Sequence, residues 1–359
     1  MNINSDFFLG KRVFVTGHTG FKGTWLCKML INMGAEVCGY SLAPVTKDSL
    51  FGMCDISDNM CSVIGDIRDY KHLKDVFNEF SPEIVIHLAA QPIVRTSYKD
   101  PRYTYETNVM GTVNLLECVR NSNGNVKSVL NVTTDKVYYN NEWVWGYREN
   151  EQLDGFDPYS NSKSCSELIT HSYWRSFFDE NNISLSTARA GNVIGGGDFS
   201  EDRIIPDCVR AVSYNKEIIV RNPNSIRPYQ HVLEPLLAYL MITEKQYECN
   251  KYAGWYNVGP NEEDCITTGN LVSLFCKHWG EGASWRVESE KNAPHEANFL
   301  KLDCSKIKSV FGWKPKWTID TAVEKTVEWS KEWLNKGNIN RIMDEQIDNF
   351  IRGGNISGV

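Results

Sequence analysis

The most constraining feature of this chain is a regular alternation of short apolar runs and longer helical stretches up to residue 190. Runs that stay apolar at consecutive positions are typical of strands buried on both faces. Strands that alternate with long helices predict a doubly wound parallel sheet with right-handed crossovers. The expected strands cover residues 13–15, 37–40, 63–64, 84–88, 129–132 and 185–188. The expected helices cover residues 20–33, 73–80, 103–120 and 159–178.

The alternation breaks after residue 192, where helices mix with short strands. The expected helices there cover residues 204–212, 233–245, 271–279 and 321–334, and the expected strands cover 255–258 and 285–287. This pattern predicts an α/β chain of two units. Residues 1–190 form the doubly wound domain, and residues 191–350 form a smaller α/β domain over the carboxyl edge of its sheet, with the chain free to cross back. The last residues, 351–359, are expected to form a frayed tail that contains Gly353 and Gly354.

Charge and cysteine content narrow the class of protein. The 359 residues carry 38 basic and 45 acidic side chains, and this net charge of −7 disfavours binding to nucleic acid or to an anionic membrane. No apolar run reaches the roughly 18 residues of a spanning helix, and the first residues lack a signal-peptide pattern. The 11 cysteines include no CxxC pair, so we expect no metal site. Scattered thiols without an export signal predict a cytoplasmic protein.

Three glycines follow the first expected strand at the spacing G-x-x-G-x-x-G and open the first expected helix. Gly17 permits a tight turn, Gly20 lets the backbone approach a pyrophosphate at the helix N-terminus, and Gly23 allows close packing of helix and strand. A glycine turn in this context predicts binding of a dinucleotide. The candidates for further cofactor contacts in the loop are His18, Phe21 and Lys22, of which His18 is a candidate for the pyrophosphate.

The stretch from Thr16 to Gly23 reads TGxxGFxG and resembles the extended short-chain dehydrogenase/reductase family. The resemblance implies a Rossmann-like fold and further contacts to the cofactor. Asp66 and Ile67 match the pair that contacts the adenine, and Leu88, Ala89 and Ala90 match the segment that lines one side of the cofactor. Thr107 is part of a TNxxGT pattern on an expected helix and matches a further cofactor contact.

The end of the second expected strand bears on which cofactor binds. An acidic residue usually holds the ribose hydroxyls of NAD there, whereas this chain has Ser41. An NADP site needs a cation nearby, and residues 41–46 contain none. The sequence therefore predicts that NAD binds and that its adenosine ribose is held more weakly than an acidic residue would hold it.

Tyr159 and Lys163 form a YxxxK pattern on an expected helix, and this spacing puts phenol and ammonium on one face. A nearby ammonium and a positively charged nicotinamide favour the phenolate, which makes Tyr159 a usable base near neutral pH. Thr134, just after an expected strand, matches the family's hydroxyl that hydrogen-bonds the substrate oxygen. The alternative is that Tyr159 and Lys163 lie on the surface of a helix and take no part in catalysis.

Asp135 and Lys136 come next, where the family's sugar-nucleotide 4,6-dehydratases carry Asp-Glu. The chain resembles these enzymes, with Lys136 in place of the glutamate. The resemblance implies oxidation at C4 by NAD, loss of water across C5 and C6, and return of the hydride to C6. Asp135 is the expected acid for the departing 6-hydroxyl, and Lys136 is either the base at C5 or a stabiliser of the enolate. The plain alternative is a surface ion pair at a strand end.

The Thr-Asp-Lys form and the tryptophan-rich residues 142–150 resemble the branch of this group that acts on CDP-glucose, which is the expected substrate. A 4,6-dehydratase of another nucleotide sugar, a nucleotide-sugar 4-epimerase and a non-catalytic dinucleotide sensor stay open. The Asp-Lys pair disfavours the epimerase, and the retained YxxxK disfavours the sensor. Trp143 and Trp145 are expected to alternate along a short strand, either as a flap over the site or as a packed hairpin.

The resemblance also implies substrate contacts in the second half of the chain. Arg227 matches an arginine that holds the pyrophosphate, and Asn192 matches a contact to a substrate phosphate. The other expected substrate contacts are Gln91, Arg203, Ile204, Pro206, Asn261, His295 and Glu296. His87, on an apolar strand, is expected to be a core histidine. The family also implies a homodimer, in which the helices at 103–120 and 159–178 pair into a bundle.

Overall fold

The computed structural model describes residues 3–44, 48–288 and 299–353. Its centre is a 7-stranded sheet in the order β11-β6-β5-β4-β1-β2-β3, and all neighbouring pairs in it are parallel. The strands are β1 (Arg12–Thr16), β2 (Glu36–Ser41), β3 (Cys61–Ile64), β4 (Ile84–His87), β5 (Ser128–Thr134), β6 (Ser184–Ala190) and β11 (Trp255–Val258). This confirms the predicted doubly wound α/β fold. The strand order reverses between β1 and β4, and ligands bind at such a point, outside the carboxyl ends of the strands.

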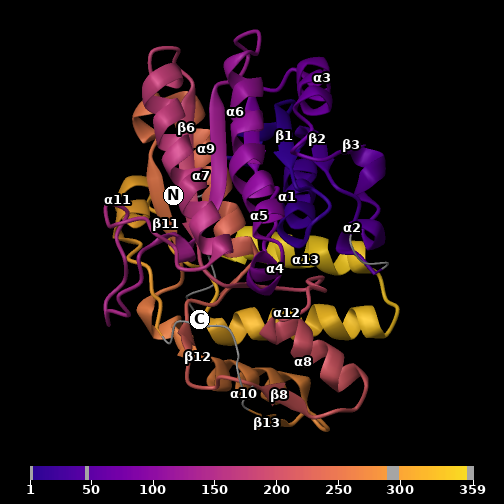
Figure 1. The fold of residues 1–359 in the computed structure, drawn as a ribbon. Coiled ribbons are helices and arrows are strands. Elements are labelled where there is room, and N and C mark those ends of the chain that lie inside the picture. The colour runs from indigo at the N-terminus through magenta and orange to yellow at the C-terminus, as the bar shows by residue number, and fades with distance from the viewer. Residues whose placement is uncertain (1–2, 45–47, 289–298, 354–359) are drawn as a thin grey trace.

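Helices cover both faces of the sheet (Figure 1). On one face, Phe14 of β1 belongs to a buried apolar cluster with side chains of three helices. On the other face, Val13 and Val15 join a second cluster with two further helices. Because consecutive residues of one strand supply both clusters, the strands appear in the sequence as unbroken apolar runs. The first three helices are α3 (Tyr70–Phe80), α6 (Gly111–Arg120) and α7 (Pro158–Tyr173), and the other two are α1 (Phe21–Asn32) and α9 (Leu233–Glu248).

A smaller group of helices and short strands surrounds its own apolar cluster below the sheet in the view of Figure 1. The chain enters this group directly after β6, so the group lies at the carboxyl edge of the sheet. Its elements are β7 (Val193–Ile194), α8 (Ile204–Ser213), β8 (Ile218–Val220), β9 (Ile226–Arg227), β10 (Gln230–His231), β12 (Ile266–Thr267), α10 (Thr268–Trp279), β13 (Trp285–Val287) and α12 (Ile319–Leu334).

Between β10 and β12 the chain returns to the sheet, where α9 packs on one face and β11 pairs with β6. The chain therefore contributes two separate stretches to the sheet layer. Short helices complete the fold, namely α2 (Leu50–Met53), α4 (Val94–Lys99), α5 (Pro101–Tyr105) and α11 (Ser305–Phe311).

One long helix, α13 (Ile339–Arg352), does not correspond to any helix expected from the sequence. Its buried residues Ile339, Met343, Ile347 and Phe350 recur every three to four positions and join the larger apolar cluster. The residues between these positions are polar, so the helix stands out little in the sequence.

Two of the expected long helices contain a wide π turn. The helix expected over 103–120 consists of α5, a π turn (Glu106–Met110) and α6, and the helix expected over 159–178 is α7 followed by a π turn (Trp174–Phe178). The first π turn contains Thr107 and Asn108, so it changes the direction of two side chains next to the candidate site. Helix α7 begins where Asp157 caps the backbone N–H of Ser160 and Pro158 takes the first turn.

The contact between Gly196 and Trp329 of α12 leads to a stability prediction. A methyl group on Gly196 would lie 1.9 Å from Cγ of the buried Trp329, and the Gly196 carbonyl also accepts a hydrogen bond from the Trp25 indole at 3.0 Å. We expect Gly196→Ala to lower the free energy of unfolding by about 1–3 kcal/mol, because the indole must move out of a packed core. Urea unfolding checks this. Gly353→Ala, whose methyl meets no atom within 4 Å, is the control, and equal midpoints for the two variants would contradict the prediction.

Candidate active site

The turn after β1 has no room for side chains. Gly17 has a φ of +79°, and a methyl group on it would lie 2.8 Å from the backbone nitrogen of Ala89. A methyl group on Gly23 would lie 2.1 Å from the carbonyl oxygen of Gly17. Gly20 caps α1 without a side-chain hydrogen bond, so the N–H groups of the first helical turn face a ligand position. The turn therefore has the exposed backbone that an anion site requires, and the predicted contact of these glycines with a pyrophosphate stays a prediction.

The imidazole of His18 is packed inside this loop. It is fully buried, its Nε2 lies 2.8 Å from the hydroxyl of Ser62, and a methyl group on Gly39 would lie 2.3 Å from its ring. Burial lowers the pKa of His18 to about 4, so the ring is neutral at pH 7. The predicted contact of His18 with a pyrophosphate stays a prediction. The structure shows that the ring holds the loop against β2 and β3.

The residues expected near the adenosine already have protein partners. Ser41 shares a hydrogen bond with Thr19 at 2.8 Å. The carboxylate of Asp66 pairs with Arg68 at 2.7 Å, and this pairing holds the pKa of Asp66 below its usual range. Ile67 is buried against Gly111. Sequence reasoning missed Arg68, although an Asp-x-Arg spacing at a strand end is a visible signal for such a pair.

The next group lies behind β4, around the π turn. The hydroxyl of Thr107 is buried and has no hydrogen-bond partner among the described residues. Asn108 donates to the backbone oxygen of Gln91 and to Ser162, so it ties β4 to α7. The carboxamide of Gln91, an expected substrate contact, already bonds Thr104 at 2.9 Å and the backbone of Ile93 at 2.7 Å. His87 lies between the hydroxyls of Thr16 and Thr112, which confirms the expected core histidine.

Tyr159 and Lys163 lie one turn apart on α7, where Lys163 is buried and Tyr159 is partly buried. Burial raises the pKa of Tyr159 to about 12, although a hydrogen bond with Thr134 and the charge of Arg203 act in the opposite direction. Burial lowers the pKa of Lys163 to about 8, and its ammonium donates to the backbone oxygen of Val132 at 3.2 Å. Without a second cation the phenol is therefore protonated at neutral pH. The phenolate favoured by the sequence needs the positive charge of a bound cofactor.

Thr134, Asp135 and Lys136 lie at the carboxyl end of β5, where a 3₁₀ turn (Asp135–Val137) begins. The Thr134 hydroxyl donates to one carboxylate oxygen of Asp135 at 2.9 Å. The other oxygen of Asp135 is buried and has no partner among the described residues, and the residue is only 1% exposed. Asp135 is therefore not a surface residue, and it presents a free acceptor beside the phenol on which its charge acts.

Lys22 of the glycine loop joins the same group of charges. Burial and the positive charges of Arg203 and Lys163 lower its pKa to about 7, while Asp135 and Asp198 act in the opposite direction. Arg203 is held by Asp198 at 3.0 Å. The loop, the helix α7 and the segment before α8 thus face one another across one site. Sequence reasoning did not single out Asp198, although it ends a conspicuous Gly-Gly-Gly-Asp run.

Of the other expected substrate residues, the structure brings only some together. The side-chain oxygen of Asn192 is buried without a partner among the described residues. Arg227 is buried and donates to the backbone of Ile226 at 2.9 Å, among other contacts. Asn261 accepts a hydrogen bond from Lys308 at 2.8 Å. Ile204 and Pro206 stand in the first turn of α8, and His295 and Glu296 lie outside the described residues.

The expected short strand at Trp143 and Trp145 is wrong. These residues form no strand, although their two indoles do lie together, with centroids 5.2 Å apart and ring planes tilted by 31°. Trp143 stacks on Tyr147, which stacks on the buried Tyr138, at centroid distances of 5.5 and 5.2 Å. The aromatic column therefore stands directly on the segment that follows Lys136.

The part of the chain that the structure describes has no metal-ligand cluster, no membrane-spanning helix and no disulfide bond. No group of three or more His, Cys, Asp or Glu side chains in the described part of the chain is placed to hold a metal ion. None of the helices in the described ranges is long and apolar enough to cross a membrane. All 11 cysteines are free thiols.

Comparisons with known proteins agree with this geometry. A family model described as GDP-mannose 4,6 dehydratase matches residues 14–326. The chain belongs to this family. It is 51% identical over 338 residues to the CDP-glucose 4,6-dehydratase of Salmonella typhimurium, covering 92% of this chain and 94% of the relative. It is 27% identical to dTDP-glucose 4,6-dehydratase 1 of Escherichia coli, covering 90% and 94%.

Solved structures of other proteins share the fold. A UDP-glucose 4-epimerase of Thermotoga maritima with UDP-glucose has a TM-score of 0.79 at 23% identity and covers 90% of this chain and 99% of its own. A dTDP-glucose 4,6-dehydratase of Bacillus anthracis in complex with NAD has a TM-score of 0.75 at 22% identity and covers 90% and 97%. These likenesses establish the Rossmann-like architecture of the dehydratase family member described here.

The buried His18 gives a prediction about acid stability. Its pKa is about 4 in the folded protein and ordinarily 6.5, so between these values the unfolded chain binds the extra proton and stability falls as the pH falls. From pH 6.5 to 5 the loss is about 2 kcal/mol for this one group. We expect His18→Gln to show a correspondingly flatter dependence of its urea midpoint on pH. A dependence as steep as that of the wild type would contradict the assignment.

Proposed function

We propose that this chain is a CDP-glucose 4,6-dehydratase, which converts CDP-glucose into CDP-4-keto-6-deoxyglucose and water with bound NAD. The observation that carries the proposal is the 51% identity to the enzyme of that name over 92% of the chain. It is supported by the arrangement of Thr134, Asp135, Tyr159 and Lys163 at the carboxyl end of β5.

The glycine cradle and the unpartnered Thr107 hydroxyl fit a dinucleotide. The turn of Gly17, Gly20 and Gly23 would hold the pyrophosphate, and Thr107 and Lys163 would face the rest of the cofactor. When bound, NAD supplies an oxidant for C4 and later a reductant for C6. Since Ser41 replaces the usual acidic residue and already bonds Thr19, the ribose is held weakly.

Tyr159 acts at the O4 hydroxyl of the sugar. Thr134 bonds the phenol and orients O4, and the O4 proton moves to the phenol oxygen of Tyr159 once positive charge in the site has lowered its pKa from about 12. Lys163 adds a buried positive charge one turn along the same helix.

Elimination across C5 and C6 requires an acid and a base. Asp135, in its protonated form, gives a proton to the departing 6-hydroxyl, and its unpartnered buried oxygen lies beside Thr134 and the phenol. Lys136 either takes the C5 proton or stabilises the enolate. A 4-epimerase has no need for this pair, which favours the dehydratase.

The CDP part of the substrate lies between the two units of the chain in this proposal. Arg203 and Arg227 hold the phosphates, because their two guanidinium groups stand at the carboxyl edge of the sheet, and the side-chain N–H of Asn192 donates to a phosphate oxygen. The remaining contacts come from Gln91, Ile204, Pro206, Asn261, His295 and Glu296.

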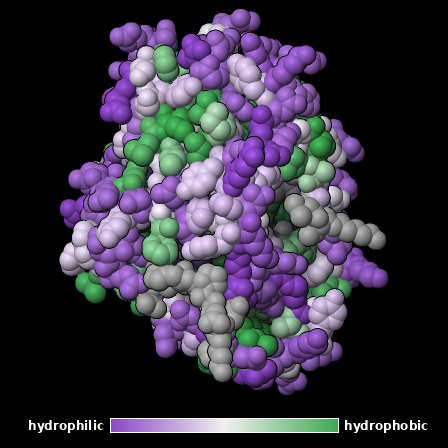
Figure 2. All heavy atoms as spheres, in the orientation of Figure 1, coloured by the Kyte–Doolittle hydropathy of each residue, from purple (hydrophilic) through white to green (hydrophobic). Residues whose placement is uncertain are grey.

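We further propose a homodimer in the cytoplasm. Met110, Leu168 and Phe177 are exposed on the outer side of the helices around α6 and α7, and Figure 2 shows a hydrophobic patch over this region. Covering this patch with a second copy explains its exposure, and sedimentation as a monomer at micromolar concentration would contradict the dimer. Eleven free thiols suit a reducing compartment.

Tyr159→Phe tests the proposed reaction. Wild-type protein with CDP-glucose and NAD is expected to form a keto product that absorbs in alkali. The variant is expected to lose roughly 10²–10⁴-fold in kcat, because the O4 proton has no acceptor. Tyr214→Phe, an exposed position on the last turn of α8, is the control and keeps wild-type turnover. Normal turnover of Tyr159→Phe would remove the phenol from its role, and a wild type without product would refute the function.

The double variant Asp135→Asn/Lys136→Met separates oxidation from elimination. Thr134, Tyr159 and Lys163 remain, so we expect the bound sugar nucleotide to be oxidised at C4 while it keeps its 6-hydroxyl. Mass spectrometry of the sugar nucleotide released by denaturation measures this, at no more than one equivalent per site. A 6-deoxy product at the wild-type rate would assign elimination to other residues. Bound substrate without oxidation would show that the pair also supports the first step.

A further inference from the structure

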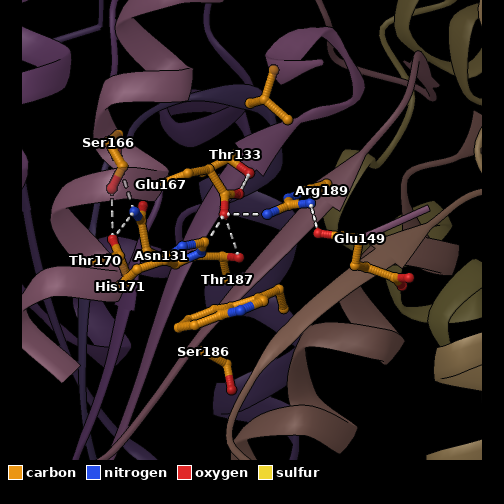
Figure 3. A network of polar contacts seen from close by, with 12 residues as sticks. Asn131, Thr133, Glu149, Ser166, Glu167, Thr170, His171, Ser186, Thr187 and Arg189 are labelled. Atoms are coloured by element: carbon orange, nitrogen blue, oxygen red, sulfur yellow. Dashed lines mark hydrogen bonds and ion pairs between the residues drawn. The ribbon is translucent and has the colours of Figure 1, made fainter. Parts of the chain in front are cut away.

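A buried carboxylate next to the candidate active site has no part in the chemistry described so far. Glu167 lies on α7, one turn beyond Lys163, and is fully buried (Figure 3). It pairs with Arg189 of β6 at 2.9 Å, and Arg189 is also fully buried. Taking two charges out of water is costly, and burial of such a pair does not by itself stabilise a protein. The pair therefore calls for an explanation other than stability.

The contacts of Glu167 join one helix to two strands. One carboxylate oxygen accepts a short hydrogen bond from Thr133 of β5, and the other accepts from Thr187 of β6 at 2.8 Å. His171, one turn further along α7, lies 3.3 Å from the same carboxylate. Thr133 precedes Thr134 and stands opposite Arg189 in the sheet register. Glu167 thus fixes α7 at the ends of the strands that carry the reacting groups.

Nearby polar contacts extend this seam along the helix. Asn131 of β5 donates to Ser166 and Thr170 of α7 at 2.9 and 2.8 Å (Figure 3). These are neutral contacts, which can shift at small cost. The charged pair is the strongest of these contacts.

Arg189 connects the same pair to the segment after Lys136. Its guanidinium donates to the hydroxyl of Tyr138 at 2.8 Å and to the backbone oxygen of Glu149 at 3.0 Å. Tyr138 in turn donates to Asn257 of β11 at 2.7 Å. The base of the aromatic column is therefore anchored through Arg189 to the helix that carries Tyr159.

We propose that Glu167 is a positioning residue for the reaction, because its carboxylate, clamped by Arg189, Thr133 and Thr187, fixes α7 on β5 and β6 and so places Tyr159 and Lys163. The inference rests on the proposed function and deepens it. Glu167 touches no reacting atom and acts through the helix and through Arg189.

The charge of Glu167 has a second effect, on Lys163. Burial disfavours the carboxylate, but Arg189, His171 and Thr133 outweigh it and hold the pKa of Glu167 below its ordinary value. Its negative charge opposes the burial that lowers the pKa of Lys163 to about 8. The other groups that act electrostatically with Lys163 are Lys22 of α1 and His87 of β4, and the latter is neutral because burial lowers its pKa to about 3. Glu167 therefore keeps the ammonium charged at neutral pH.

The experiment compares Glu167→Gln, Glu167→Asp and the wild type by steady-state kinetics and by calorimetric titration with NAD from pH 6 to 10. For Glu167→Gln we expect kcat to fall about tenfold or more at pH 7 with little change in KM, because substrate contacts are untouched. The alkaline midpoints of kcat and of NAD affinity should move about one unit lower, because Lys163 loses its proton earlier. Glu167→Asp keeps the charge and is expected to retain the wild-type midpoints with a reduced kcat.

A matched control is Glu234→Gln, the same substitution at a fully buried carboxylate on α9 that accepts from the backbone of Lys316 and Trp317. It should change stability without moving either midpoint. Wild-type kcat and midpoints in Glu167→Gln, or the same shift in Glu234→Gln, would overturn the proposal.

Two further outcomes of the experiment also bear on the proposal. If Glu167→Gln does not fold, Glu167→Gln/Arg189→Met removes the unpaired charge and takes its place, and wild-type midpoints there would overturn the proposal. If the wild type binds NAD but leaves CDP-glucose unchanged, the proposed function fails. The titration with NAD still decides the role of Glu167, because it does not depend on turnover.

Discussion

The placement of helix α7 on strands β5 and β6 is the constraint on which the rest of the site depends. Tyr159 and Lys163 come from the helix, and Thr134 and Asp135 come from the end of β5, so a small sliding of the two would separate the phenol from its hydroxyl partner. The seam between them is polar and buried. A polar seam satisfies its hydrogen bonds in one arrangement, whereas an apolar seam packs almost equally well in several. The buried polar contacts therefore fix the relative positions of the site residues, although burying them is costly.

Much of the fold could be predicted from the sequence because the strongest patterns are local. Strands buried on both faces are apolar at consecutive positions, and the turn needs a glycine at position 17 because a methyl group there would lie 2.8 Å from the backbone nitrogen of Ala89. For the same reason the YxxxK pair and the hydroxyl of Thr134 were identifiable, since spacing on one helix or one strand places them. The observed strands extend the expected ones by only a few residues, as at β5 (Ser128–Thr134).

What the sequence did not predict depends on distant partners. Helix α13 is stabilised by the apolar cluster under the sheet, and its polar composition hid a clear three-to-four periodicity. The protonated state of Tyr159 follows from its burial, which raises the pKa of the phenol and outweighs the hydrogen bond with Thr134 and the charge of Arg203. Trp143 stacks on Tyr147, and Tyr147 stacks on the buried ring of Tyr138, which is a contact that the alternation of residues along the chain does not reveal. Glu167 pairs with Arg189 of β6, and this contact between a helix and a strand has no local spacing that would reveal it.

The contact of Trp329 with Gly196 also has a meaning for the order in which the protein is made. Helices α12 and α13 follow all the other helices and strands in the chain, yet they complete the apolar cluster on which α1 and its glycine turn rest. A nascent chain that has not yet released residue 319 from the ribosome already contains the turn, the YxxxK pair and the strand ends. It lacks the indole that packs on Gly196, and it acquires a finished cofactor cradle only as synthesis of these last helices ends.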